Sequence, residues 1–181
     1  MAEVSRAPAS ATPDPNKFWS LVEPYDRALK AFAYRLVGDR DLMDDALQEA
    51  YLRAFRALPS LRGADAMRSW LYRIVYSAAM DLLRARRRTP HVALDHTVER
   101  PDPAPDPAEV AASRRDLAAA LDSLPPSMRA AVLLVDAEGR SYEEAGAILG
   151  VPEGTVASRL SRAREVLRRA MASDSEGGTE P

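Results

Sequence analysis

The sequence predicts an all-α protein, in which two small helical bundles are joined by a flexible, acidic, proline-rich linker and the C-terminal bundle contains a helix-turn-helix. Three observations lead to this fold class. Apolar residues recur three and four positions apart along most of the chain, which is the period of an amphipathic helix. A stretch rich in proline and acidic residues, 89–112, interrupts this pattern. The length of 181 residues allows two small domains, one on each side of that stretch.

The first bundle is expected to span residues 16–88, after a disordered arm at 1–15 that is rich in Ala, Pro and Ser. Because proline interrupts helices, Pro24 is expected to divide a short lead-in from a first helix of about 24–37. Gly38 then ends that helix. Its inward stripe consists of Leu29, Phe32, Ala33 and Leu36.

Two further helices complete this bundle. One is predicted over about 40–57, with Asp39 as its cap and Pro59 as its stop. Its apolar side consists of Met43, Leu47, Ala50, Ala54 and Leu58. The other is predicted over about 67–87. Its buried side consists of Leu71, Ile74, Val75, Ala78 and Leu82.

The second bundle is expected to span residues 110–172, between a flexible linker at 89–109 and a disordered acidic tail at 173–181. It begins with two helices on either side of Pro125-Pro126. The first is marked by Leu117, Leu121 and Leu124, and the second by Met128, Ala131, Val132, Leu134 and Val135.

A helix-turn-helix is predicted from Ser141 onward. Ser141 is a good N-cap, and Glu144 three residues later completes a capping box. The first helix therefore runs to about Leu149, and Gly150 ends it. A second helix opens at Pro152. Its inward stripe consists of Val156, Leu160, Ala163 and Leu167.

The outward side of this last helix is short, polar and cationic, and it consists of Thr155, Ser158, Arg159 and Arg162. Hydroxyl and guanidinium groups in such a row suit the base edges and phosphates of a DNA major groove. An ordinary solvated amphipathic helix would show the same periodicity, so the spacing alone leaves both interpretations open.

The helix over 40–57 carries Asp45, Gln48 and Glu49 on one strip beside its apolar side. A strip of this kind is either a plain solvated face or a surface for a basic partner.

The helix over 67–87 mixes basic and aromatic residues on its outer side. These residues are Trp70, Tyr72, Arg73, Tyr76, Ser77, Arg84, Arg87 and Arg88. Arginines that follow phosphates and rings that stack on exposed bases suit single-stranded or melting DNA. The alternative is that Trp70 and one tyrosine belong to the core and that the arginines form a C-terminal charge cluster.

Three stretches resemble bacterial sigma factors of the extracytoplasmic-function group. They are SYEEAGAILGVPEGTVASRLSRARE at 141–165, DDALQEAYLRAFRAL at 44–58 and RSWLYRIVYSAAMDLLRARRR at 68–88. The resemblance implies a region 2-like domain at 16–88, which holds the polymerase clamp and captures melted −10 DNA. It also implies a region 4-like domain at 110–172, which reads the −35 element as duplex.

Four residues at three places depart from the family pattern. Ala145-Gly146 replaces the more frequent Ile-Ala, which is expected to loosen the packing between the two helices of the helix-turn-helix. Ala157 replaces a common Lys and removes one phosphate contact. Ser77 replaces the usual Asn, whose side chain reaches further toward a base.

Charge is distributed unevenly along the chain. The net charge is −2, yet residues 17–88 carry 14 basic and 9 acidic groups, whereas 89–112 carry 1 and 5. The first bundle is therefore basic, as a nucleic-acid-binding domain would be. The resemblance implies that the acidic linker threads through the polymerase near the RNA path; a plain spacer fits the composition equally well.

Several function classes are not expected. The chain has no cysteine, and its two histidines lie in the linker, so neither a metal site nor any other cofactor is expected. No apolar run approaches the ~18 residues of a membrane span, and we expect a cytosolic protein. No nucleophile and base recur in a catalytic pattern, so an enzyme is not expected.

The resemblance implies core RNA polymerase, promoter DNA and an anti-sigma factor as partners. Two different DNA-facing helices on one chain would read a two-part asymmetric site without a dimer, so a monomer is expected outside the holoenzyme. Two other functions remain open at this point. One is a helix-turn-helix regulator that dimerises and binds operators without polymerase. The other is a polymerase-binding antagonist that never contacts promoter bases.

Overall fold

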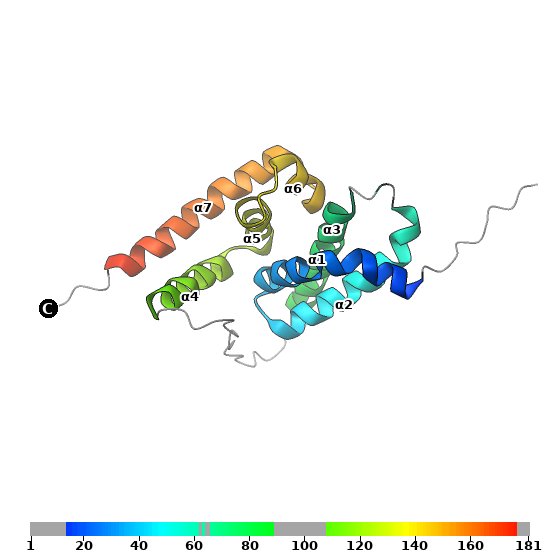
Figure 1. Cartoon of the computed structure of the whole chain (residues 1–181). Coiled ribbons are helices and arrows are strands. Elements are labelled where there is room, and N and C mark those ends of the chain that lie inside the picture. Colours follow the sequence, from blue (N-terminus) through cyan, green and yellow to red (C-terminus); the bar gives the residue numbers. More distant parts are fainter. Residues whose placement is uncertain (1–13, 62, 64–65, 89–107, 177–181) are drawn as a thin grey trace, which may run out of the picture.

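The computed structural model describes residues 14–61, 63, 66–88 and 108–176, and its regular structure is helical throughout those ranges. The predicted all-α class is confirmed. The first bundle contains α1 (Pro15–Val37), α2 (Arg40–Ala57), the 3₁₀ turn η1 (Leu58–Ser60) and α3 (Met67–Arg88). The second contains α4 (Ala108–Ser123), α5 (Pro126–Val132), the π-helical turn η3 (Leu133–Ala137), α6 (Tyr142–Leu149) and α7 (Glu153–Glu176) (Figure 1). The predictions for residues 1–13, 89–107 and 177–181 lie outside the described residues.

The helix α1 continues through Pro24, so the predicted division at that residue is wrong. A proline inside a helix costs about 3 kcal/mol through a lost hydrogen bond and a steric clash. Phe18 and Val22 precede it on the same helix and are both buried. Burial of two such side chains contributes roughly 3–6 kcal/mol, which offsets the cost of the proline. Asp14 caps the helix by accepting from the backbone N–H of Asn16 at 2.9 Å.

The helix α7 extends to Glu176, so the prediction of a disordered tail from residue 173 is wrong for its first four residues. The sequence gives the physical reason. No glycine or proline occurs between Gly154 and Gly177, so no residue in that stretch interrupts the helix.

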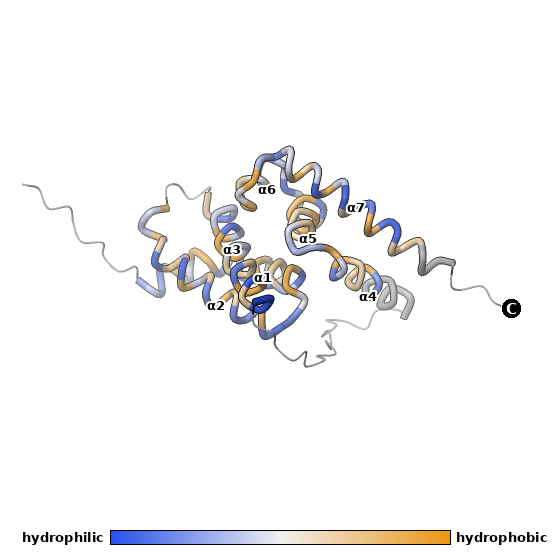
Figure 2. The backbone as a smooth tube through the Cα atoms, turned by 180° about the vertical axis from the view of Figure 1, so that it is seen from behind, coloured by the Kyte–Doolittle hydropathy of each residue, from blue (hydrophilic) through white to orange (hydrophobic). Residues whose placement is uncertain are grey.

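A single hydrophobic core passes through both bundles. Helix α3 packs against α6, and α1 packs against α5. Phe32 and Leu36 from the first bundle and Leu124 and Leu134 from the second are all fully buried in that core. In Figure 2 α5 lies between α1 and α7. The sequence predicted two bundles, but its periodicity did not predict that they pack against each other.

Candidate nucleic-acid and polymerase interfaces

The helix-turn-helix consists of α6, a tight turn and α7. Ser141 caps α6 with its hydroxyl, which accepts from the backbone N–H of Glu144 at 3.1 Å, and the Glu144 carboxylate accepts from the backbone N–H of Ser141 at 2.9 Å. This hydrogen bond from Ser141 holds the pKa of Glu144 below its usual value. Gly150 ends α6 in the left-handed conformation, with a φ of 68°. The predicted capping box and stop are confirmed.

Gly146 brings the turn close to α6 instead of loosening it. A Cβ at this position would lie 2.7 Å from the carbonyl oxygen of Val151, which is inside van der Waals contact. The backbone N–H of Val151 also donates to the carbonyl of Gly146 at 3.0 Å. The expectation that Ala145-Gly146 loosens the two helices is therefore wrong, because the missing side chain permits a closer approach.

The helix α7 has the two faces that its spacing predicts. Val156, Leu160 and Ala163 are buried in the core. On the other side Ser158 and Arg162 are exposed, whereas Thr155 and Arg159 are half-buried. Nη1 of Arg159 is buried and has no hydrogen-bond partner among the residues that the structure describes. The face therefore combines two hydroxyl groups, the exposed guanidinium of Arg162 and the half-buried guanidinium of Arg159, whose Nη1 can still donate a hydrogen bond.

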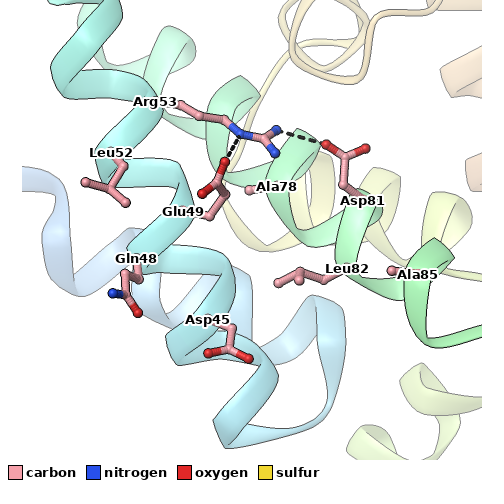
Figure 3. A pocket seen from close by; sticks show the side chains of 9 residues that line it. All are labelled: Asp45, Gln48, Glu49, Leu52, Arg53, Ala78, Asp81, Leu82 and Ala85. Atoms are coloured by element: carbon pink, nitrogen blue, oxygen red, sulfur yellow. Dashed lines mark hydrogen bonds and ion pairs between the residues drawn. The ribbon is translucent and has the colours of Figure 1, made fainter. Parts of the chain in front are cut away.

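The acidic strip on α2 forms one wall of a groove, and α3 forms the other (Figure 3). Asp45 and Gln48 are exposed at this wall, and Glu49 accepts from Nε of Arg53 at 2.7 Å. Arg53 then crosses to α3, where its Nη1 donates to Asp81 at 2.9 Å. The hydrogen bonds from Arg53 to these two carboxylates raise its pKa.

The groove combines charge with apolar surface. Its complete lining is Asp45, Gln48, Glu49, Leu52, Arg53, Ala78, Asp81, Leu82 and Ala85. Leu52 is nearly half exposed, at 45%. The residues on α3 were not predicted for this site, because their distance in sequence from α2 gave no signal that they lie opposite it. The groove can accept a cationic side chain together with an apolar one.

The face of α3 predicted for melted DNA is only partly exposed. Ser77, Arg84, Arg87 and Arg88 are exposed, and Trp70 and Tyr76 are half-buried. Arg84 pairs with Asp81 at 2.9 Å, and Arg86 pairs with Asp39 at 3.3 Å.

Tyr72 is completely buried, so its predicted place on the exposed face is wrong for this structure. Its ring packs on Phe32, with ring centroids 5.1 Å apart. Its hydroxyl donates to Glu138 at 2.7 Å. Burial, followed by this hydrogen bond, raises the pKa of Tyr72 to about 12. The alternative in which one tyrosine belongs to the core fits this residue.

Arg73 is exposed but already engaged. Its Nε and Nη2 donate to the backbone carbonyl of Ala147 on α6, at 2.9 and 2.5 Å. The N-terminal half of α3 is thus in contact with the second bundle, whereas the arginines at its C-terminal end are exposed.

Two further features are absent from the part of the chain that the structure describes. No group of three or more His, Asp or Glu residues among them is arranged to hold a metal ion. None of the helices in those ranges is long and apolar enough to cross a membrane.

The two bundles match two family models. The model for Sigma-70 region 2 matches residues 21–89, and the model for Sigma-70, region 4 matches residues 114–167. These ranges correspond to the first bundle and to most of the second.

The chain is also similar to individual sigma factors. It is 42% identical over 159 residues to the ECF RNA polymerase sigma factor SigE of Mycolicibacterium smegmatis, which covers 86% of this chain and 62% of that relative. It is 34% identical over 165 residues to the ECF RNA polymerase sigma-E factor of Escherichia coli K12, which covers 85% and 86% of the two chains.

Two solved structures have a similar fold. The sigma factor RpoE of Bartonella quintana, in complex with the anti-sigma factor NepR, matches with a TM-score of 0.73 and 28% identity, over 88% of this chain and 99% of that one. CnrH, in complex with the cytosolic domain of CnrY, matches with a TM-score of 0.64 and 27% identity, over 89% and 91%. Both similarities extend over both bundles, and the chain belongs to the extracytoplasmic-function family of RNA polymerase sigma factors.

Proposed function

We propose that this chain binds core RNA polymerase and directs it to specific promoters. The observation that carries the proposal is the pairing of the two family regions with the two bundles, in one chain. The domain limits remain those expected from the sequence, 16–88 for the first function and 110–172 for the second. In this proposal promoter selection depends on binding alone, and no bond-making step or cofactor is required.

In this proposal α7 reads the −35 element as duplex DNA. Its exposed Arg162 and Ser158 face outward, and Arg159 has a guanidinium nitrogen that a base or phosphate could satisfy. Guanidinium groups pair in a bidentate way with guanine and with phosphate, and each good pair discriminates against the wrong base by about 1–3 kcal/mol. Thr155 completes the proposed face near the start of the helix.

The helix α3 captures melted −10 DNA in the same proposal. Its exposed arginines follow the phosphates, and the rings of Trp70 and Tyr76 stack on unpaired bases, each stack contributing about 1–3 kcal/mol. Ser77 is exposed and can donate to or accept from a base. Arg73 joins this surface only when its bonds to the carbonyl of Ala147 are broken. Tyr72 is a core residue and is not part of it.

The groove between α2 and α3 receives the polymerase clamp. Asp45, Gln48 and Glu49 offer carboxylate and amide oxygens to a basic helix, and Leu52 offers an apolar contact. Charge-assisted hydrogen bonds of this kind fix orientation and raise the rate of association. The polymerase lies in the cytoplasm, and we place the function of this chain there with it.

A first experiment tests polymerase binding directly. Asp45→Arg places a cation in the acidic groove, and we expect it to weaken binding of purified core polymerase by tenfold or more, about 1.4 kcal/mol or above. The matched control is Asp44→Arg, which makes the same charge change at an exposed neighbour outside the groove lining. Fluorescence anisotropy of the labelled chain gives both affinities, and equal losses in the two variants would contradict the assignment.

An anti-sigma protein is the third proposed partner. One similar structure is a complex of the sigma factor RpoE with the anti-sigma factor NepR, and another is a complex of CnrH with the cytosolic domain of CnrY. We propose that this chain likewise forms a complex with an inhibitor and is otherwise monomeric outside the polymerase.

A helix-turn-helix regulator would behave differently in solution. It would dimerise and bind an operator tightly without polymerase. Mobility-shift experiments with promoter fragments, with and without core polymerase, separate the two functions. We expect a specific shift only when both proteins are present; a tight specific shift by the chain alone would favour the regulator.

A further inference from the structure

The residues of α7 that are proposed to read duplex DNA form one row, which consists of Thr155, Ser158, Arg159 and Arg162. This row meets the base edges only if α7 keeps one rotation about its own axis. The inner stripe of the helix is apolar, with Val156, Leu160 and Ala163 buried in the core. Apolar burial is not directional, so it fixes the depth of a helix better than its rotation. Directional bonds from α7 to its neighbours would therefore decide where the row points.

Arg164 makes such bonds on another side of α7. Its Nε donates to Oδ2 of Asp136 at 3.2 Å, and its Nη2 donates to Oδ1 at 2.6 Å. Two parallel bonds between a guanidinium and a carboxylate fix orientation as well as distance. The hydrogen bonds to Asp136 raise the pKa of Arg164, and Tyr142 at the start of α6 adds to the shift. Arg164 follows Arg162 by two positions, about 200° around the helix, so it points away from the row.

Asp136 lies on the π-helical turn η3, which joins α5 to α6. The backbone N–H of Glu138 donates to the carbonyl of Leu133 at 3.0 Å, and this bond across five residues is the mark of such a turn. Single π-helical turns are rare and occur frequently at functional sites. Here the turn carries the carboxylate that Arg164 binds.

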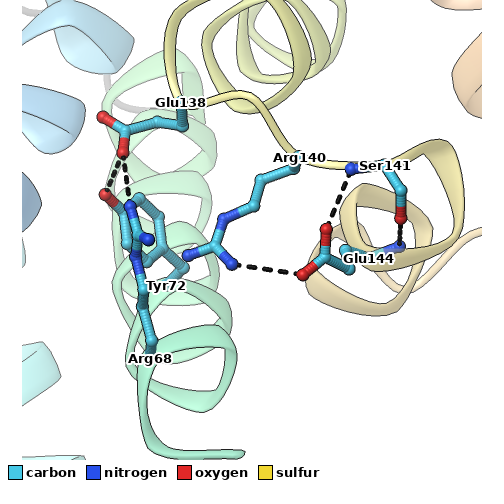
Figure 4. Close-up of polar contacts among 6 residues, drawn as sticks. All are labelled: Arg68, Tyr72, Glu138, Arg140, Ser141 and Glu144. Atoms are coloured by element: carbon cyan, nitrogen blue, oxygen red, sulfur yellow. Dashed lines mark hydrogen bonds and ion pairs between the residues drawn. The ribbon is translucent and has the colours of Figure 1, made fainter.

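The chain that follows η3 is itself held by hydrogen bonds on two sides (Figure 4). On one side Glu138 accepts from the hydroxyl of Tyr72 at 2.7 Å. On the other side Nη1 of Arg140 donates to Glu144 at 3.3 Å, next to the capping box that begins α6. Asp136 is thus part of a fixed frame, formed by η3 and α6, and a bond to Asp136 ties α7 to that frame.

We infer that Arg164 is a positioning residue for DNA recognition: its bidentate pair with Asp136 sets the rotation of α7 and aims the row at the base edges, while Arg164 itself does not contact DNA. The effect on DNA binding rests on the proposed function, whereas the fixation of α7 by the pair does not.

The other role open to an exposed arginine on this helix is a phosphate contact. Arg164 is 47% exposed and Asp136 is 37% exposed, so solvent reaches both side chains. Two donors of Arg164 are already directed at Asp136, and the negative charge of that carboxylate repels a phosphate at the same place. The geometry therefore favours positioning over a contact.

The expected effect is modest, because the pair is exposed. Exposed ion pairs change an equilibrium by roughly 1.4- to 5-fold. The loss of specific affinity cannot exceed the preference that the pair gives to one orientation of α7. We therefore expect specific binding to weaken about threefold to fivefold when the pair is broken.

The first arm of the test compares Asp136→Ala with the wild-type chain, each bound to core polymerase. Fluorescence anisotropy at fixed salt gives the affinities for a promoter duplex and for a random-sequence duplex. The variant breaks the pair without changing α7, and it removes a negative charge, so charge alone would tighten both. We expect the promoter to bind about threefold to fivefold more weakly and the random duplex to bind as before or more tightly. Glu165→Ala is the control, because it removes the same charge from a carboxylate that pairs with Arg168 within α7.

The second arm changes the other partner. Arg164→Lys keeps the positive charge but loses the fork that binds Asp136 at two points. It should weaken promoter binding as Asp136→Ala does and leave the random duplex unchanged. In the Asp136→Ala chain the same change should have no further effect, because both residues act through one pair. Tighter promoter binding by Asp136→Ala, or equal weakening on both duplexes by Arg164→Lys, would indicate a phosphate contact and would overturn the inference.

A third arm measures the pair in the free chain. The nuclear magnetic resonance signal of the Nε–H group of Arg164 is assigned by its absence in Arg164→Lys. We expect slow exchange with water in the wild-type chain and in Glu165→Ala, and fast exchange in Asp136→Ala. Fast exchange in the wild-type chain would overturn the fixation of α7. If the wild-type chain with core polymerase binds no promoter specifically, the proposed function fails and the effect on DNA fails with it, whereas this arm still decides the fixation.

Discussion

The two central arginines of α7 differ in what they need from a ligand. Arg162 is exposed and hydrated, whereas Arg159 has a buried guanidinium nitrogen without a partner in the described part of the chain. A buried donor that lacks an acceptor costs about 1–3 kcal/mol. An acceptor supplied by DNA would recover that cost, so a hydrogen bond from Arg159 to DNA would contribute more to the affinity than one from Arg162. Arg162 would contribute mainly through its charge.

For Arg162→Ala we predict that the polymerase complex binds its promoter more weakly by about 1–3 kcal/mol, roughly 5- to 150-fold. The cause is the loss of a guanidinium that faces DNA. Arg168→Ala is the matched control, because Arg168 is exposed on the same helix and pairs with Glu165. Equilibrium binding to a promoter duplex at fixed salt gives both values. Equal losses would show that general positive charge, rather than the predicted face, carries the affinity.

The raised pKa of Tyr72 has a consequence for stability at high pH. The hydroxyl ionises near pH 10 in the unfolded chain but near pH 12 in the folded one. Between these values the unfolded chain binds fewer protons, so the free energy of unfolding falls as pH rises. The contribution is fully present below pH 10, and a shift of this size corresponds to about 1–3 kcal/mol lost by pH 12.

Tyr72→Phe should make the free energy of unfolding less sensitive to pH in that window, while lowering it at neutral pH through the lost hydrogen bond to Glu138. Burial also raises the pKa of Tyr51, so Tyr51→Phe serves as the comparison and should remove a separate part of the same slope. Urea unfolding across the alkaline range measures both. An unchanged slope in Tyr72→Phe would contradict the assigned burial.

At the level of the helix, α6 depends on its ends, because it has only eight residues. Isolated helices of this length are marginal in water. The capping box satisfies two backbone groups and Gly150 permits the tight stop. Since α6 positions α7 and also contacts α3, its ends influence both proposed DNA surfaces.

Ser141→Ala should lower the free energy of unfolding by about 1 kcal/mol, within a range of 0.5–2, because the first turn of α6 loses its acceptor. Ser161→Ala lies inside α7 at an exposed position, where alanine favours the helix, and should be neutral or slightly stabilising. Chemical denaturation gives the two values. A neutral Ser141→Ala would mean that the cap contributes little.

Local signals in the sequence were sufficient for most helices. The caps at Asp39 and Ser141 and the stops at Gly38 and Gly150 are where the sequence predicts them, because each acts through residues within one turn. Pro24 misled the prediction, since the burial that outweighs it depends on α2 and α3, which are distant in sequence.

Only part of the candidate sites could be predicted from the sequence. The outward row on α7 follows from periodicity alone. The second wall of the α2 groove, with Asp81 and Leu82, required the packing of α3, and the burial of Tyr72 required the packing of the second bundle. No periodicity within one helix encodes a contact with a bundle some sixty residues later.

For the whole molecule, the joint core explains how a chain with two binding domains behaves before it meets polymerase. The acidic groove is open, and the N-terminal half of α3 is covered. The groove proposed for polymerase is thus accessible in the free chain, whereas Arg73 on α3 is bonded to the second bundle.

The most direct measurement of the central claim is run-off transcription with purified core polymerase over a pool of genomic promoter fragments. We predict specific transcripts when the wild-type chain is added, none without it, and few or none with Asp45→Arg. Arg162→Ala should reduce or redirect them. If no transcripts appear with the wild-type chain while the chain alone shifts a defined duplex, the protein is not acting as a promoter-specificity factor and the assignment of both bundles is wrong.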